Sequence, residues 1–113
     1  MRTVPKMSLP DDPSVSTAEQ FGAAIRAARC AANLTLADAA TALGMAKQTL
    51  ANLETAKRGV SLETALRAAH SFGLTVLAVP TTQQEAVRKA VSKARDNDQP
   101  GSGPLPTRKA RTP

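Results

Sequence analysis

A glycine between two short helix-length segments constrains the fold of this chain more than any other feature of its sequence. Gly44 separates an apolar-periodic segment at residues 36–43 from a second one at about residues 46–55. Glycine readily adopts the left-handed backbone conformation that ends a helix, so it can turn the chain sharply at this point. Two helices set at a steep angle around a tight turn make a helix-turn-helix. The sequence therefore predicts this motif over residues 36–53.

The apolar residues of this segment fall where such a motif needs an inner face. Ala40 is small where the two helices approach each other. The other predicted inward positions are Ala39, Leu43, Met45, Leu50 and Leu53. At about 100° per residue, Gln48 and Asn52 point nearly opposite to this face. Lys47 and Thr49 flank them, so the second helix has a polar outer face.

Side chains of these four types suit the edges of base pairs. Glutamine and asparagine form paired hydrogen bonds with adenine, lysine favours guanine or phosphate, and a threonine methyl can meet the methyl of thymine. A helix-turn-helix reads DNA by placing such a helix in the major groove. We therefore expect base contacts to double-stranded DNA from Lys47, Gln48, Thr49 and Asn52.

Residues at the borders of the motif are candidates for phosphate contacts. The first turns of two predicted helices, at residues 35–37 and 61–63, carry free N–H groups that attract anions. A basic loop follows the reading helix, where a DNA backbone would pass; alternatively, its charges are ordinary solvated ones. The candidate phosphate contacts are Thr35, Ala37, Lys57, Arg58 and Ser61.

Two further helices complete a predicted all-α domain. The first spans about residues 17–32 and is capped by Ser16 or Thr17. Its apolar face consists of Phe21, Ile25, Ala28 and Ala32. The last begins after Ser61, runs to Phe72 and ends at Gly73.

Residues 75–79 (TVLAV) break the helical pattern, because they are apolar and partly β-branched and are closed by Pro80. They predict a short strand. A lone strand needs a partner for its backbone groups, and the simplest one is the same strand of a second subunit. We expect a symmetric homodimer joined through Thr75, Val76, Leu77, Ala78 and Val79. The alternative is an extended segment that packs on the helices of its own domain.

The flanking segments differ from this domain, which spans residues 17–80. The proline-containing residues 1–16 predict a flexible arm, residues 81–97 a candidate basic helix, and residues 98–113 a disordered tail. The net charge of +6 suits an anionic partner, and most of the excess lies after residue 80. The basic C-terminal segment is either a solvated tail or a source of non-specific phosphate contacts.

Several classes of site find no support in the sequence. Cys30 is the single cysteine, so no intrachain disulfide forms, and no Cys/His cluster has the spacing of a metal site. Neither a glycine-rich phosphate loop nor a nucleophile–base pair occurs, so we expect no cofactor and no enzyme activity. With Phe21 and Phe72 as its only aromatic residues, the chain is poorly suited to single-stranded nucleic acid. No membrane-spanning run or signal-peptide core occurs, which predicts a soluble protein.

Residues 21–74 resemble the lambda Cro/C1-type helix-turn-helix family. The residues that carry the resemblance are IRAARCAANLTLADAATALGMAKQTLANLE and the later SLETALRAAHSFGL. The resemblance implies a lambda-repressor-like domain of four to five helices, with a buried structural ion pair between Arg29 and Glu54. The chain departs from the family at two positions. Leu36 replaces a glutamine that commonly contacts phosphate and braces the reading helix, and Ala46 replaces a Ser or Thr cap.

The TVLAV segment is similar to the strand of the HipB-type antitoxin branch, which dimerises through it. The resemblance implies a dimeric transcriptional repressor of its own operon that binds a palindromic operator. The HipB-like branch adds an antitoxin role, with a HipA-like kinase toxin as partner. Such a protein works in the bacterial cytoplasm, on the nucleoid when bound to DNA, and away from membranes. The alternative is a protein-interaction adaptor that keeps the fold without specific DNA binding, which only Leu36 favours.

Overall fold

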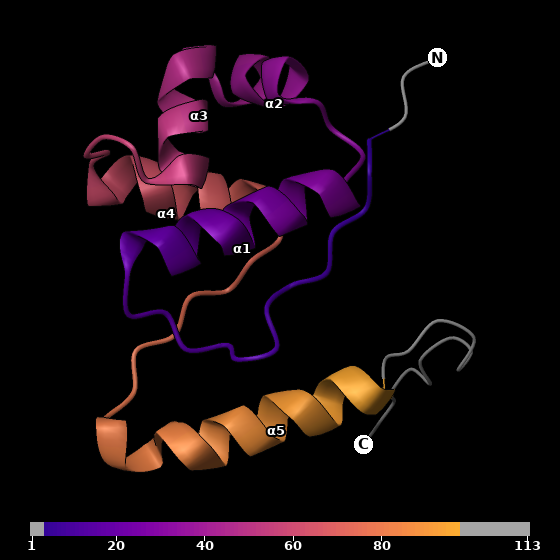
Figure 1. The fold of residues 1–113 in the computed structure, drawn as a ribbon, viewed down its shortest axis with the longest axis vertical. Coiled ribbons are helices and arrows are strands. Elements are labelled where there is room, and N and C mark those ends of the chain that lie inside the picture. Colours follow the sequence, from indigo (N-terminus) through magenta and orange to yellow (C-terminus); the bar gives the residue numbers. More distant parts are fainter. Residues whose placement is uncertain (1–3, 98–113) are drawn as a thin grey trace, which may run out of the picture. The chain divides into compact units, whose positions relative to one another are not determined.

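Five α-helices account for most of residues 4–97, the part of the chain that the structure, a computed structural model, describes. They are α1 (Ala18–Ala31), α2 (Leu36–Leu43), α3 (Lys47–Thr55), α4 (Leu62–Ser71) and α5 (Gln84–Asn97), with a 3-10 turn at Thr81–Gln83 (Figure 1). Residues 4–97 contain no strand, so this part of the fold is all-α. None of its helices is long and apolar enough to cross a membrane. The tail predicted at residues 98–113 lies outside the described residues.

Local sequence sets where three of the helices begin. Thr17, Thr35 and Ser61 cap α1, α2 and α4, and each hydroxyl oxygen accepts a hydrogen bond at 3.1 Å from the backbone N–H three residues later. Gln20 completes a capping box, because its Oε1 accepts from the Thr17 N–H at 3.2 Å. The caps predicted at Thr35 and Ser61 are confirmed, and of the two candidates for the first helix, Ser16 and Thr17, the cap is Thr17. Each of the first four helices lies within one residue of its predicted bounds.

The turn between α2 and α3 depends on Gly44, as predicted. Its φ of +68° and ψ of +33° place it in the left-handed region. The Gly44 N–H donates to the carbonyl of Thr41 at 3.1 Å, and the Met45 N–H donates to that of Ala40 at 3.0 Å. These two bonds close the end of α2, so α3 starts only three residues beyond Gly44.

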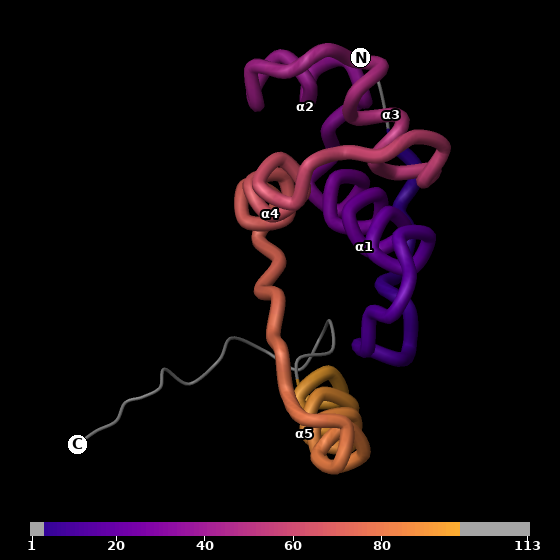
Figure 2. The backbone as a smooth tube through the Cα atoms, turned by 90° about the vertical axis from the view of Figure 1, so that its left-hand side faces the viewer, coloured from indigo at the N-terminus to yellow at the C-terminus, as the bar shows by residue number. Residues whose placement is uncertain are grey.

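The core of the helix-turn-helix unit is built from aliphatic and small residues on four helices. Ile25 of α1 and Leu50 of α3 are fully buried at its centre. Around them lie Ala39, Ala40, Leu43, Leu53, Ala65, Ala68 and Ala69. α1 packs against both α3 and α4, and α2 packs against α3 (Figure 1, Figure 2). Ala32 was expected on the inner face of the first helix but is exposed, because α1 ends at Ala31.

Gly22 marks a close approach between α1 and α3. A Cβ atom at this position would lie 2.5 Å from the carbonyl oxygen of Leu53 and 2.6 Å from that of Glu54. Because both neighbours are backbone atoms, a side chain here would push the two helices apart. Gly22 therefore lets α1 contact the end of α3 directly.

The described chain divides into two compact units, residues 4–10 with 15–78 and residues 11–14 with 79–97. The first unit holds α1 to α4. Its N-terminal residues lie against the end of α1: Val4 is buried, and its N–H donates to Asn33 Oδ1 at 3.2 Å. Lys6 Nζ donates to the carbonyl of Ala31 at 3.3 Å.

The second unit joins α5 to a short acidic segment. Asp12 accepts a hydrogen bond from the Ser14 N–H at 2.9 Å and pairs with Arg88 at 3.3 Å. Hydrogen bonds from Ser14, and secondarily the charge of Arg88, lower the pKa of Asp12 below its ordinary value. Gln84 Nε2 adds a hydrogen bond to Ser14 Oγ at 2.9 Å.

Residues 75–79, for which the sequence predicts a strand, are not paired within the single chain. No second extended segment in residues 4–97 forms a ladder with them. Val76, Leu77 and Val79 are 51%, 66% and 42% exposed, although Leu74 just before them packs against the core. The exposed side chains do not support the alternative that this segment packs on its own domain.

Candidate nucleic-acid interface

α2 and α3 hold the steep, tightly turned arrangement that a helix-turn-helix requires. α3 stands across α1, with α2 beside it (Figure 1). Arg67 of α4 donates from Nη1 to the carbonyl of Leu43 at 2.6 Å, at the last residue of α2. A charge-assisted bond to a helix C-terminus opposes the negative end of the helix dipole. Arg67 thus ties α4 to the turn; helical patterning gave no signal for this contact.

The two faces of α3 differ in the way that its sequence predicts. Leu50 is fully buried and Leu53 is 7% exposed, so both face the core. Lys47 and Gln48 are exposed, and Thr49 and Asn52 are half-buried. The predicted outward direction of Gln48 is confirmed, whereas the Asn52 side chain is partly buried against the domain. Gln48 Nε2 donates a hydrogen bond to Asn52 Oδ1 at 3.0 Å.

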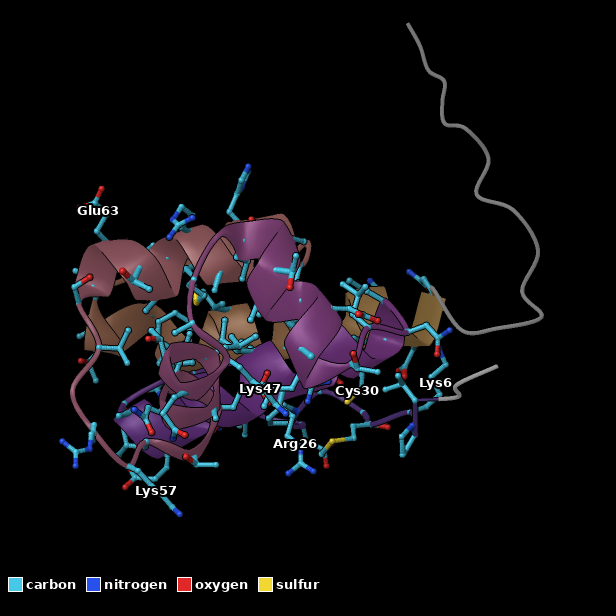
Figure 3. All side chains as sticks on the ribbon, turned by 90° about the horizontal axis from the view of Figure 1, so that it is seen from above. Lys6, Arg26, Cys30, Lys47, Lys57 and Glu63 are labelled. Atoms are coloured by element: carbon cyan, nitrogen blue, oxygen red, sulfur yellow. The ribbon has the colours of Figure 1, made fainter. Side chains whose placement is uncertain are left out.

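The candidate phosphate-contacting residues border α3 on the same unit. Lys57 and Arg58 are exposed in the loop after α3, and the Lys57 side chain points away from the ribbon (Figure 3). At the start of α2, the Thr35 hydroxyl accepts a hydrogen bond from the N–H of Asp38, and at the start of α4, the Ser61 hydroxyl accepts one from the N–H of Thr64. The hydroxyls are therefore committed to capping, and a phosphate would meet the backbone N–H groups of the first turns.

Two acidic residues modify the potential at these helix starts. Asp38 lies in the first turn of α2, and Glu63 lies in the first turn of α4 and points outward (Figure 3). A carboxylate in this position is favourable for the helix dipole but repels a phosphate. The exposed cations Lys57 and Arg58 are the stronger attraction for a DNA backbone at this border.

A buried ion pair fixes the end of α3 to α1. Arg29 Nε donates to Glu54 Oε2 at 2.6 Å and Nη2 donates to Oε1 at 3.0 Å, while Nη1 donates to the carbonyl of Leu34 at 2.7 Å. Both side chains are buried, and the hydrogen bonds to Glu54 raise the pKa of Arg29 further above its ordinary value. The contact expected between Arg29 and Glu54 is present, and it also anchors the chain just before α2.

The two departures from the family pattern have visible consequences. Leu36 is half-buried and packs against the core, so the start of α2 gains apolar contact where a polar side chain would reach outward. Ala46 precedes α3 with φ −68° and ψ 144°, but it offers no side-chain cap. Leu36 and Ala46 leave the helix geometry unchanged. Leu36 lacks the phosphate contact of the family's glutamine, and Ala46 lacks the hydroxyl that would cap α3.

Other candidate sites are sparse in the described part of the chain. No group of three His, Cys, Asp or Glu side chains within residues 4–97 could hold a metal ion. A cavity of about 160 Å³ lies beside α3, lined by Ala18, Phe21, Asn52, Leu53, Ala56, Arg58, Gly59 and Val60. Most of this lining is apolar, and Asn52 and Arg58 are its polar members.

Comparison with known proteins agrees with this geometry. Residues 25–78, just under half of the chain, match the protein-family model described as Helix-turn-helix. No curated protein matches the chain. The matched segment contains α2, the Gly44 turn, α3 and α4. Residues 25–78 are therefore similar to the helix-turn-helix domains that this model describes.

Proposed function

We propose that this protein is a sequence-specific transcriptional regulator that binds double-stranded DNA by placing α3 in the major groove. The observation that carries the proposal is the polarity of α3, whose inner face is buried while Lys47 and Gln48 are exposed. This face belongs to a matched helix-turn-helix domain. In such a domain, the N-terminal part of the second helix meets base edges.

Within this proposal, the residues of the site have two roles. Base contacts come from the outer face of α3, that is, from Lys47, Gln48, Thr49 and Asn52. Phosphate contacts come from the loop cations and the first turns of α2 and α4, that is, from Thr35, Ala37, Lys57, Arg58 and Ser61. The Arg29–Glu54 pair is structural, because both side chains are buried away from the groove.

We further propose that two copies act together. The exposed Val76 and Leu77 and the unpaired backbone of residues 75–79 support antiparallel pairing with the same segment of a second copy. A two-fold dimer would place two α3 helices on successive major grooves, about 34 Å apart along the DNA. The operator would then be palindromic, and a repressor of this kind would act on its own promoter.

A HipB-like antitoxin role is the sharper form of the proposal, supported by the similarity of residues 75–79 to the strand of that branch. The partner would be a HipA-like kinase toxin, and the setting would be the bacterial cytoplasm. The competing function is an adaptor that binds proteins only. Leu36 favours the adaptor, because its position against the core removes the usual phosphate contact at α2.

A gel shift with the duplex DNA upstream of the gene separates these functions. We expect the full chain to shift this DNA at low salt, and Gln48→Ala to weaken the specific complex by about tenfold, since one bidentate base contact accounts for a loss of this order. The melting temperature of Gln48→Ala should stay at the wild-type value, because Gln48 is exposed. Gln83→Ala, another exposed glutamine, is the matched control. A folded protein that gives no shift at low salt would indicate the adaptor.

A further inference from the structure

We infer that Asn52 acts as a positioning residue for Gln48, so that Gln48, held by Asn52, reads one adenine. This inference rests on the proposed function and deepens it. It changes the role of Asn52 from a second reader to a support for the first. Three observations on α3 carry it: a hydrogen bond, a difference in burial, and the chemistry of the atoms left free.

The hydrogen bond joins the two side chains across one turn of α3. Gln48 Nε2 donates to Asn52 Oδ1 at 3.0 Å, and residues four apart lie one above the other on a helix. A free glutamine side chain samples many rotamers and loses that freedom when it binds a base. The bond to Asn52 restricts this freedom before DNA arrives.

The difference in burial decides which residue reads and which supports. Gln48 is exposed, whereas Asn52 is half-buried and lines the cavity with Phe21 and Val60. Asparagine is also one methylene shorter than glutamine. Asn52 is therefore held against the domain surface, while Gln48 extends beyond it toward a groove.

The atoms left free on Gln48 identify the base. Its amide nitrogen carries two hydrogens, of which Asn52 takes one, so one N–H donor and the Oε1 acceptor remain. Adenine presents an acceptor at N7 and a donor at N6 in the major groove, which match this pair. Guanine presents two acceptors there and cannot satisfy Oε1. The Gln48–Asn52 pair therefore selects adenine.

Selection from a randomised duplex library, followed by sequencing, tests this assignment. The wild-type chain should enrich a motif that contains a strongly preferred adenine. Gln48→Ala should relax the preference at that base pair. Asn52→Ala should relax the same base pair and lower affinity for the selected duplex by about two- to tenfold, the effect expected for freeing one side chain. The double variant should bind no more weakly than Gln48→Ala alone.

Matched measurements separate positioning from damage to the fold. Thr55→Ala removes an exposed hydroxyl of α3 that bonds only the carbonyl of Ala51, and it should leave the motif unchanged. The melting temperature of Asn52→Ala should stay close to wild type. If Asn52→Ala reduced the sequence preference at a different base pair, or at no base pair, the positioning role would be overturned. The proposed reading of DNA by α3 would stand in either case. A wild-type chain that enriches no motif would overturn the proposed function itself.

Discussion

At the scale of single residues, Arg29 concentrates more interactions than any outward-facing side chain of the site. Its guanidinium bonds both carboxylate oxygens of Glu54 and the carbonyl of Leu34, which links α1 to the end of α3 and to the chain before α2. A buried pair of this kind adds little stability relative to apolar residues, but removing one partner leaves an uncompensated charge. The pair therefore fixes the direction of α3 rather than contacting DNA.

Arg29→Ala should lower the free energy of unfolding by about 3–5 kcal/mol, because Glu54 would stay buried without its partner. Urea denaturation followed by circular dichroism measures this change. Arg26→Ala is the control, since Arg26 is an exposed arginine on the same helix. Replacing both partners, Arg29→Met with Glu54→Leu, should recover much of the loss. An equal effect of Arg26→Ala and Arg29→Ala would refute the importance of the pair.

Gly22→Ala should also destabilise the domain, by about 1–3 kcal/mol, because the new Cβ would press on backbone atoms of Leu53 and Glu54. Helix propensity alone predicts the opposite sign, a gain of about 1 kcal/mol for alanine over glycine. The same denaturation experiment therefore distinguishes the two effects by sign. An increase in stability would show that the space between Gly22 of α1 and the end of α3 is wide enough for a Cβ atom.

At the scale of elements, α3 differs from the other helices of the first unit in having no side-chain cap at its N-terminus. Ala46 has the extended backbone of an N-cap, similar to that of Thr35 and Ser61, but its side chain accepts no hydrogen bond. α3 is only nine residues long, so its stability comes from packing of Leu50 and Leu53 rather than from its ends.

Ala46→Ser should stabilise the domain by about 1 kcal/mol, because a serine hydroxyl could accept an N–H of the first turn of α3 without any backbone change. Thr35→Ala should change the free energy of unfolding by a similar amount in the opposite direction, since it removes the cap of α2. Thermal denaturation of both variants shows whether Ala46→Ser raises the stability and Thr35→Ala lowers it. If Ala46→Ser left the stability unchanged, capping would not limit α3.

The elements also show what the sequence could and could not predict. The caps at Thr35 and Ser61 and the turn at Gly44 depend on short-range backbone chemistry, so each was predictable from a few neighbouring residues. The contact of Gly22 with α3 and the bond from Arg67 to α2 depend on how distant segments meet. Helical periodicity contains no such information. A glycine inside α1, where it is unfavourable, was the one available signal for Gly22.

At the scale of the whole molecule, assembly is the property that one chain cannot display. Residues 75–79 carry strand-forming side chains, yet a strand exists only when a second one pairs with it. Val76, Leu77 and Val79 expose apolar side chains in the single chain, and the proposed pairing with a second copy would cover them. The strand at residues 75–79 stays a prediction, because no strand forms in the single chain and its pairing depends on another chain.

Val76→Asp combined with Leu77→Asp should convert a dimer to a monomer, because charged side chains would be buried at the shared strand. Sedimentation equilibrium measures this directly, since one chain has a mass of 11.8 kDa. Both positions are exposed in the single chain, so its fold should be unaffected. Thr82→Asp, at a nearby exposed position, should leave the dimer intact. A wild-type monomer, or a variant that stays dimeric, would rule out this interface.

Contact between the outer face of α3 and DNA can be observed residue by residue by NMR. Amide chemical shifts of the labelled full chain are recorded while duplex DNA from upstream of its gene is added. We expect the largest changes at Lys47, Gln48 and Thr49, with further changes in the first turns of α2 and α4. Changes confined to α5, or an unperturbed α3 at saturating DNA, would show that α3 does not contact DNA.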